Sequence, residues 1–170
     1  MLLFLVGCDL PLTDIAIRGD SATVVEAGTL VEELLSDFGF EDFVSMDLTQ
    51  AEELSNQGVQ PGDISAAALT EFSLTAEQGA PDLSFFDRMD LSVSAPALDT
   101  VLLAQADAFP EDQATVELLT TGTDIVDYLV SEAMTLEVGV EAHRPDEDTT
   151  VRADWTVVVT VTTQGAVSNL

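Results

Sequence analysis

The sequence predicts a mainly β protein, an antiparallel β-sandwich of about seven strands with two or three short helices. Apolar and polar side chains alternate in several segments, and Gly, Pro and Asp residues that favour turns recur between them. The chain has 170 residues, of which 46% are apolar, and is therefore long enough for one domain with its own core. Many short strands separated by turns are typical of sandwiches.

The clearest alternation lies in the last third of the chain. Residues 134–142 carry an apolar side chain at every second position, and residues 151–161 do the same around the single tryptophan, Trp155. A polar turn over residues 143–148 separates the two segments. This pattern predicts a long antiparallel hairpin with one face on the core and the other in solvent.

Shorter alternating segments predict the remaining strands. Residues 15–17, continued by Ala22 and Val24, indicate strands near the N-terminus, and residues 89–95 indicate a strand that ends at Pro96. Residues 101–104 and 114–119 predict two more, separated by a turn at Pro110. In residues 64–76 the predicted inward face consists of the even-numbered positions, which are Ile64, Ala66, Ala68, Thr70, Phe72, Leu74 and Ala76.

Three segments predict helices. Thr29 followed by Glu32 forms a capping box, apolar residues then recur at helical spacing as far as Phe38, and Gly39 stands where such a helix would stop. We expect a second helix over residues 49–57, ended by Gly58, and a third over residues 124–131.

The N-terminus carries the most specific motif of the chain. Residues 1–6 are all apolar, and they lead into the tetrapeptide Leu5-Val6-Gly7-Cys8. Cys8 is the only cysteine, so an internal disulfide is impossible. No apolar run approaches the length of about 20 residues that a membrane-spanning helix needs.

This tetrapeptide resembles the lipobox of bacterial lipoproteins. The resemblance implies that residues 1–7 are a signal peptide, that Cys8 carries the lipid, and that residues 8–13 tether a single acidic β-sandwich domain formed by residues 14–170. It places the protein in a bacterial cell envelope, facing the periplasm or the exterior. Signal peptides of this family begin with basic residues, which are missing here, so we expect the signal to begin upstream of Met1.

The charge of the chain is strongly one-sided. It has 32 acidic residues, four arginines and no lysine, which gives a net charge of -28. Such a chain repels phosphate backbones, so nucleic-acid binding is excluded. Two interpretations of the acidity stay open: a strongly solvated surface, or adaptation to high salt, in which screening removes the self-repulsion.

The candidate functional side chains are few. His143, the only histidine, lies at an exposed turn that lacks the surroundings of a Ser-His-Asp triad. One cysteine and one histidine cannot form a zinc site, and no Gly-rich phosphate loop is present. Weak calcium candidates are the carboxylates of one turn, with a second group further upstream: Asp146, Glu147 and Asp148, then Asp82, Asp87 and Asp90.

The leading hypothesis for function is a non-enzymatic, lipid-anchored lipoprotein whose β domain binds or scaffolds another envelope protein. The first alternative is a carrier that holds an apolar ligand or lipid between sandwich and helices. In that case Phe38, Phe40 and Phe43 would border an apolar groove, although they equally suit a core contact of the first helix. A hydrolase with carboxylate catalysis ranks third, and no cofactor other than calcium is expected.

Overall fold

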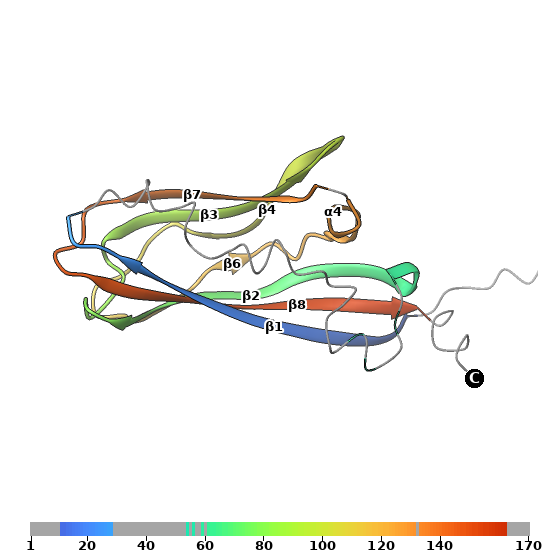
Figure 1. The fold of residues 1–170 in the computed structure, drawn as a ribbon, viewed down its shortest axis with the longest axis horizontal. Helices are drawn as coiled ribbons and strands as arrows, with labels where there is room; N and C mark the ends of the chain where they lie inside the picture. The colour runs from blue at the N-terminus through green and yellow to red at the C-terminus, as the bar shows by residue number, and fades with distance from the viewer. Residues whose placement is uncertain are drawn as a thin grey trace, which may run out of the picture.

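The computed structural model describes residues 11–28, 54, 56, 59, 61–131 and 133–162. They form two antiparallel sheets of four strands, which lie as two layers on a shared core (Figure 1). The mainly β prediction is confirmed, with eight strands in this part of the chain instead of about seven. The strands are β1 (Pro11–Val25), β2 (Ile64–Gln78), β3 (Phe86–Ala95), β4 (Leu98–Ala106), β5 (Thr115–Glu117), β6 (Leu119–Thr120), β7 (Thr135–Ala142) and β8 (Thr149–Thr162).

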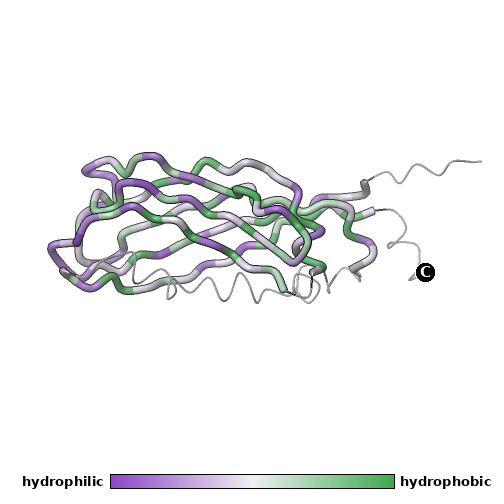
Figure 2. The backbone as a smooth tube through the Cα atoms, turned by 90° about the horizontal axis from the view of Figure 1, so that it is seen from above, coloured by the Kyte–Doolittle hydropathy of each residue, from purple (hydrophilic) through white to green (hydrophobic). Residues whose placement is uncertain are grey.

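The first sheet is built around β8, the last of the described strands. Its order is β1-β8-β2-β5, so that β8 pairs with β1 on one side and with β2 on the other. The pairing with β1 extends from Pro11 opposite Thr162 to Val25 opposite Thr149. The predicted inward face of β8 is confirmed, because these residues are all buried: Val151, Ala153, Trp155, Val157, Val159 and Val161. Figure 2 shows hydrophobic and hydrophilic residues alternating along such strands.

The predicted hairpin in the last third of the chain is wrong, although both of its strands exist. The second sheet has the order β6-β4-β3-β7, and β7 pairs with β3 in that sheet, whereas β8 belongs to the first sheet. Residues 143–148 therefore cross from one layer to the other. The alternation was misleading because it shows only which face of a strand is buried, and strands in opposite layers face the same core.

The predicted inward face of residues 64–76 is correct only in its second half. Phe72 and Leu74 are buried, but further upstream the buried residues are Ala67 and Leu69 instead of their even-numbered neighbours. The pairing with β8 shifts between Leu69 and Glu71, which identifies Thr70 as the extra residue of a β-bulge. A bulge exchanges the inward and outward positions on its two sides, so a single period of two cannot describe the strand.

Residues 114–119 form two very short strands instead of the single predicted one. β5 pairs with β2 in the first sheet, and β6 pairs with β4 in the second. Between them Leu118 is buried, and its backbone N–H donates to the carbonyl oxygen of Phe72 at 2.8 Å. The segment thus links the two sheets along one side, and β1 and β7 are the outer strands on the opposite side.

The N-terminal strand is present and is longer than predicted. β1 begins at Pro11, so residues 11–13, expected in the tether, belong to the strand. Its buried residues are Ile15, Ile17 and Val25. Ala22 and Val24 lie on the outward face, and Val24 is 51% exposed. The strand structure predicted through Ala22 and Val24 is therefore present, with both side chains on its solvent side.

Gly19 explains how β1 fits against the centre of the core. It lies opposite Trp155 of β8, and a Cβ atom added at Gly19 would be 2.5 Å from the indole ring. The tryptophan is only 3% exposed. The absence of a side chain at position 19 therefore makes room for the largest side chain of the first sheet.

The third predicted helix is present but short. It is α4 (Val126–Leu129), and a 3-10 turn, η3 (Pro61–Asp63), precedes β2. The Asp124 carboxylate accepts from the N–H of Val126 at 3.1 Å and from that of Ala67 at 3.0 Å, which holds the helix start on β2. The first predicted helix lies outside the described residues, as does the second except for Leu54 and Asn56.

Gly79 is predicted to be the least replaceable glycine of the described turns. Its φ of +94° favours glycine, and an added Cβ would collide with the carbonyl oxygen of Asp148. We expect Gly79→Ala to lower the free energy of unfolding by about 2–3 kcal/mol in urea denaturation. Gly28 has a φ of +74° with nothing within 4 Å of the added atom, so Gly28→Ala should cost only about 1 kcal/mol. Equal losses in the two variants would contradict the steric part of this prediction.

Candidate functional site

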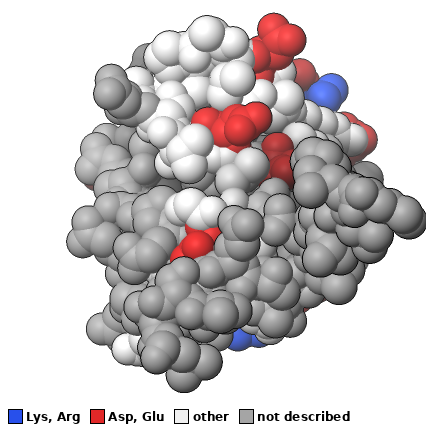
Figure 3. All heavy atoms as spheres, turned by 90° about the vertical axis from the view of Figure 1, so that its right-hand side faces the viewer, with Lys and Arg blue, Asp and Glu red and all other residues white. Residues whose placement is uncertain are grey.

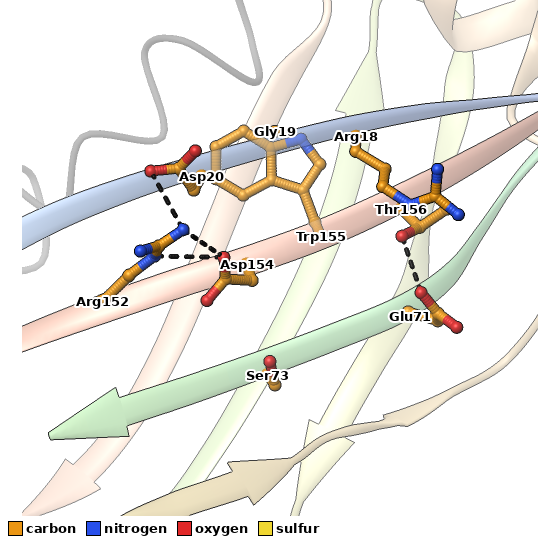
Figure 4. Close-up of a pocket in the computed structure, with 9 residues that line it drawn as sticks. All are labelled: Arg18, Gly19, Asp20, Glu71, Ser73, Arg152, Asp154, Trp155 and Thr156. Atoms are coloured by element: carbon orange, nitrogen blue, oxygen red, sulfur yellow. Dashed lines mark hydrogen bonds and ion pairs between the residues drawn. The ribbon is translucent and has the colours of Figure 1, made fainter.

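The outer face of the first sheet carries an open depression with a volume of about 380 Å³ (Figure 4). Its lining comes from neighbouring positions of three adjacent strands. Arg18 and Asp20 lie on β1, Asp154 and Thr156 on β8, and Glu71 on β2. These five side chains are polar or charged, and Trp155 also lines the depression.

Arg152 dominates the electrostatics beside this depression. Its guanidinium group lies 2.9 Å from the carboxylate of Asp154, and 3.5 Å from those of Asp20 and Glu77. The hydrogen bond and charge of Asp154, followed by the charge of Asp20, raise the pKa of Arg152 above its ordinary value. The arginine thus links β1, β2 and β8, and three carboxylates already surround its charge.

A second polar contact in the depression joins β8 to β2. The hydroxyl group of Thr156 donates to the Glu71 carboxylate at 2.7 Å, as Figure 4 shows. Arg18 is exposed and lies beside this pair. No histidine or cysteine lies among the lining residues of this depression.

The predicted calcium candidates lie at one end of the molecule, in the connection between β7 and β8. Asp146, Glu147 and Asp148 are all exposed. The carboxylate of Asp148 accepts from the backbone N–H of Ala27 at 2.8 Å, so it holds the end of β1. Within the described residues, no group of three or more His, Cys, Asp or Glu side chains is arranged to hold a metal ion.

The second group of acidic candidates also separates in space. Asp87 lies 3.7 Å from the Nδ1 atom of His143, and both side chains are more than half exposed. Asp90 lies on the outer face of the second sheet, with its carboxylate over Gly139. Asp82 belongs to the loop before β3. His143 is therefore an exposed turn residue, in agreement with the sequence-based expectation.

Asp82 joins two loops through its carboxylate. One oxygen accepts from the N–H of Ser84 at 3.0 Å, and the other accepts from the N–H of Asp112 at 2.8 Å. The residue is only 8% exposed. Hydrogen bonds from the side chain of Ser84, from the backbone of Asp112 and from the backbone of Ser84 lower the pKa of Asp82 below its ordinary value of 3.8.

The stability of the fold is predicted to depend on the ionised form of Asp82. Because its pKa is lowered in the folded state, the carboxylate stabilises the fold above the ordinary pKa, and this contribution disappears as the pH falls through the folded-state value. Asp82→Asn should lower the midpoint of thermal unfolding at neutral pH. Below about pH 4 the difference from the wild type should shrink. Asp87→Asn is the exposed control, and a difference for Asp82→Asn that is constant with pH would contradict the prediction.

The outer strand of the second sheet forms a third surface, the β7 edge, defined as residues Thr135–Ala142. Among the described residues β7 pairs with β3 alone. Its inward side chains pack against the core but are only partly buried: Leu136, Val138, Val140 and Ala142. This row of apolar side chains at an unpaired strand edge is the kind of surface to which another strand can be added.

Carboxylates line the outward side of the β7 edge. Glu137 and Glu141 are exposed, and the Asp90 carboxylate covers Gly139 between them, where an added Cβ would be 2.7 Å from a carboxylate oxygen. Glu137 accepts a hydrogen bond from Ser94 at 2.9 Å, and Arg88 lies opposite Glu141 on β3. The edge therefore combines a half-exposed apolar row with a negatively charged row.

The β7 edge was not among the predicted site residues. Its alternation identified a half-buried strand, but alternation contains no information about whether a strand is central or outer. Of the residues singled out in the sequence, Cys8 and the phenylalanines Phe38, Phe40 and Phe43 lie outside the described residues. Their predicted roles remain predictions.

Comparison of the chain with protein-family models, with curated proteins and with solved structures found no match. In the part of the chain that the structure describes, no helix has the length and apolar character needed to cross a membrane. Function must therefore be inferred from the motif at Cys8 and from the surfaces described above.

Proposed function

We propose that this chain is a bacterial lipoprotein, held in the cell envelope by lipid on Cys8, whose β domain binds another envelope protein without catalysing a reaction. The observation that supports binding most directly is the β7 edge, which among the described residues pairs on one side only and presents a partly buried apolar row. Proteins normally protect such edges with proline, lysine or a bulge. None of these interrupts β7 between Thr135 and Glu141.

The position of β1 is compatible with an anchor at Cys8. The strand begins at Pro11, and three residues can span at most roughly 10 Å. A lipid on Cys8 would therefore keep the start of β1 close to the membrane surface. The connection between β7 and β8 lies at the other end of β1, since Val25 pairs with Thr149. The β7 edge would extend away from the membrane and stay accessible.

The chemistry of the described surface favours binding over hydrolysis. A glycosidase-type or related hydrolase needs a carboxyl group whose pKa is raised in a cleft. Asp82, the most enclosed carboxylate of the described residues, has its pKa lowered by hydrogen bonds. Its role is to join two loops, which is a structural role.

The anchor is tested by the intact mass of the protein after expression with its complete signal in a bacterium. We expect cleavage before Cys8, an added diacylglycerol and recovery in the membrane fraction, and Cys8→Ser should abolish all three. An unmodified Cys8 with the leader retained would overturn the anchor.

Binding is tested in the same cells by placing a photoreactive amino acid at position 137 and, as a control, at position 117. Both positions are exposed glutamates on strands, but Glu117 lies on β5 at the opposite side of the body. We expect a discrete cross-linked product from position 137 only. The same products from both positions would contradict a binding site at the β7 edge.

A further inference from the structure

We propose that the β7 edge binds an extended segment of a partner protein that continues the antiparallel sheet and alternates apolar residues with lysine or arginine. This inference rests on the proposed function and names the chemistry of the partner at the same site. Three features of the edge support it: a backbone that pairs on one side only within the described residues, an apolar row and a row of carboxylates.

The backbone of β7 is suited to receive a further strand. From Ser94 opposite Thr135 to Arg88 opposite Glu141, the pairing of β3 with β7 has no register shift. In a regular antiparallel pair, about half of the N–H and C=O groups of an outer strand point away from its neighbour. The backbone of β7 therefore presents a regular row of donors and acceptors to a partner.

The side chains of β7 determine which residues of an added strand would face the core and which would lie beside the carboxylates. Leu136, Val138 and Val140 are only partly buried, so apolar residues at alternate positions of an added strand would cover them and extend the core. The intervening residues of that strand would lie beside Glu137 and Glu141. A basic residue at those positions would meet an opposite charge, which is favourable between directly paired strands.

A second copy of this chain is a poor occupant of the edge. In an antiparallel pair of two β7 strands that keeps both apolar rows on one face, the two longest registers place Glu137 opposite Glu141 or opposite Gly139. The carboxylate of Asp90 lies over Gly139, so both registers bring carboxylates together. Each chain also has a net charge of -28, which adds long-range repulsion. These charges favour a basic partner.

The test measures the binding of synthetic peptides to the full chain by fluorescence anisotropy. The probe is a peptide of about nine residues in which valine and lysine alternate. One control peptide has glutamate at every lysine position, and another keeps the lysines but has prolines that prevent strand pairing. We expect the valine-lysine peptide alone to bind, with amide-exchange protection appearing in β7.

Two double variants distinguish binding at the β7 edge from a general attraction between a basic peptide and an acidic protein. Glu137→Lys with Glu141→Lys should weaken binding of the valine-lysine peptide by about tenfold, because two attractive pairs become repulsive. Glu111→Lys with Glu117→Lys makes the same change in net charge at exposed positions away from β7, and it should weaken binding by less than about twofold. Circular dichroism checks that both variants are folded.

Equal weakening by the two double variants, or equal binding of the proline-containing peptide, would overturn the proposal, since net charge alone would then explain the affinity. A dimer in sedimentation experiments that Glu137→Lys with Glu141→Lys abolishes would also overturn it, in favour of a second copy. If no peptide binds but position 137 gives a discrete cross-linked product, the proposed chemistry of the partner is wrong and the proposed function survives. If both fail, neither survives.

Discussion

Replacing Trp155 with alanine is expected to lower the free energy of unfolding by about 3–5 kcal/mol, the usual cost of removing a large buried aromatic side chain. Trp155 is 3% exposed on the central strand of the first sheet, between Gly19 of β1 and Phe72 of β2. The neighbouring glycine has no side chain that could fill the space. The cavity would therefore persist, and the loss should lie at the upper end of this range.

Thermal unfolding followed by far-UV circular dichroism measures this effect, which corresponds to a fall of about 10 °C or more in the midpoint for a domain of this size. Val158→Ala is the matched control, because Val158 lies on the outward face of the same strand and is only partly buried. Its loss should be about 1 kcal/mol. A similar fall for both variants would show that Trp155 is not a centre of the core.

Raising the salt concentration is expected to stabilise the folded chain strongly. The chain has a net charge of -28, and the described surface at the end where β8 finishes shows several acidic side chains and little basic surface (Figure 3). At roughly 1 M salt the screening length falls to about 3 Å, so most of this repulsion disappears. We expect the thermal midpoint to rise by about 10 °C or more between low and molar sodium chloride.

The fluorescence of Trp155, the only tryptophan, reports unfolding in this experiment without a label. Sucrose at equal osmolality is the control for general exclusion from the protein surface, which also stabilises folded proteins. Stabilisation by charge screening should increase mainly below about 1 M salt and then level off. Stabilisation by exclusion of the salt from the protein surface should continue to increase with concentration. A midpoint that does not change with sodium chloride would favour the solvated-surface interpretation of the acidity over adaptation to high salt.

The sequence predicted the strands of this fold better than their pairing. The inward face of β8 was identified correctly because every second residue from Val151 to Val161 is apolar, and all of them are buried. The partner of β8 was not identified, because burial on a shared core is the same for a strand in either layer. The bulge at Thr70 was also not predicted, since one extra residue changes the phase without any glycine or proline to mark it.

The candidate site was less predictable than the fold. The acidic groups at residues 82–90 and 146–148 are close in sequence, yet the structure assigns them to separate contacts at Ser84, Gly139 and Ala27. The β7 edge depends on topology, because the same residues would form no site if another strand covered them. Its glutamates became informative only when their position on an outer strand was known.

The place of β8 in the first sheet has a consequence for the order in which the molecule can form. Among the described strands β8 is the last in the sequence, yet it separates β1 from β2 and pairs with both. Neither β1 nor β2 has its main partner until residues 149–162 are available, so the first sheet cannot assemble before β8 has been synthesised. Contacts between such distant parts of a chain also form slowly. β1 would therefore stay without its main partner strand until β8 has been made.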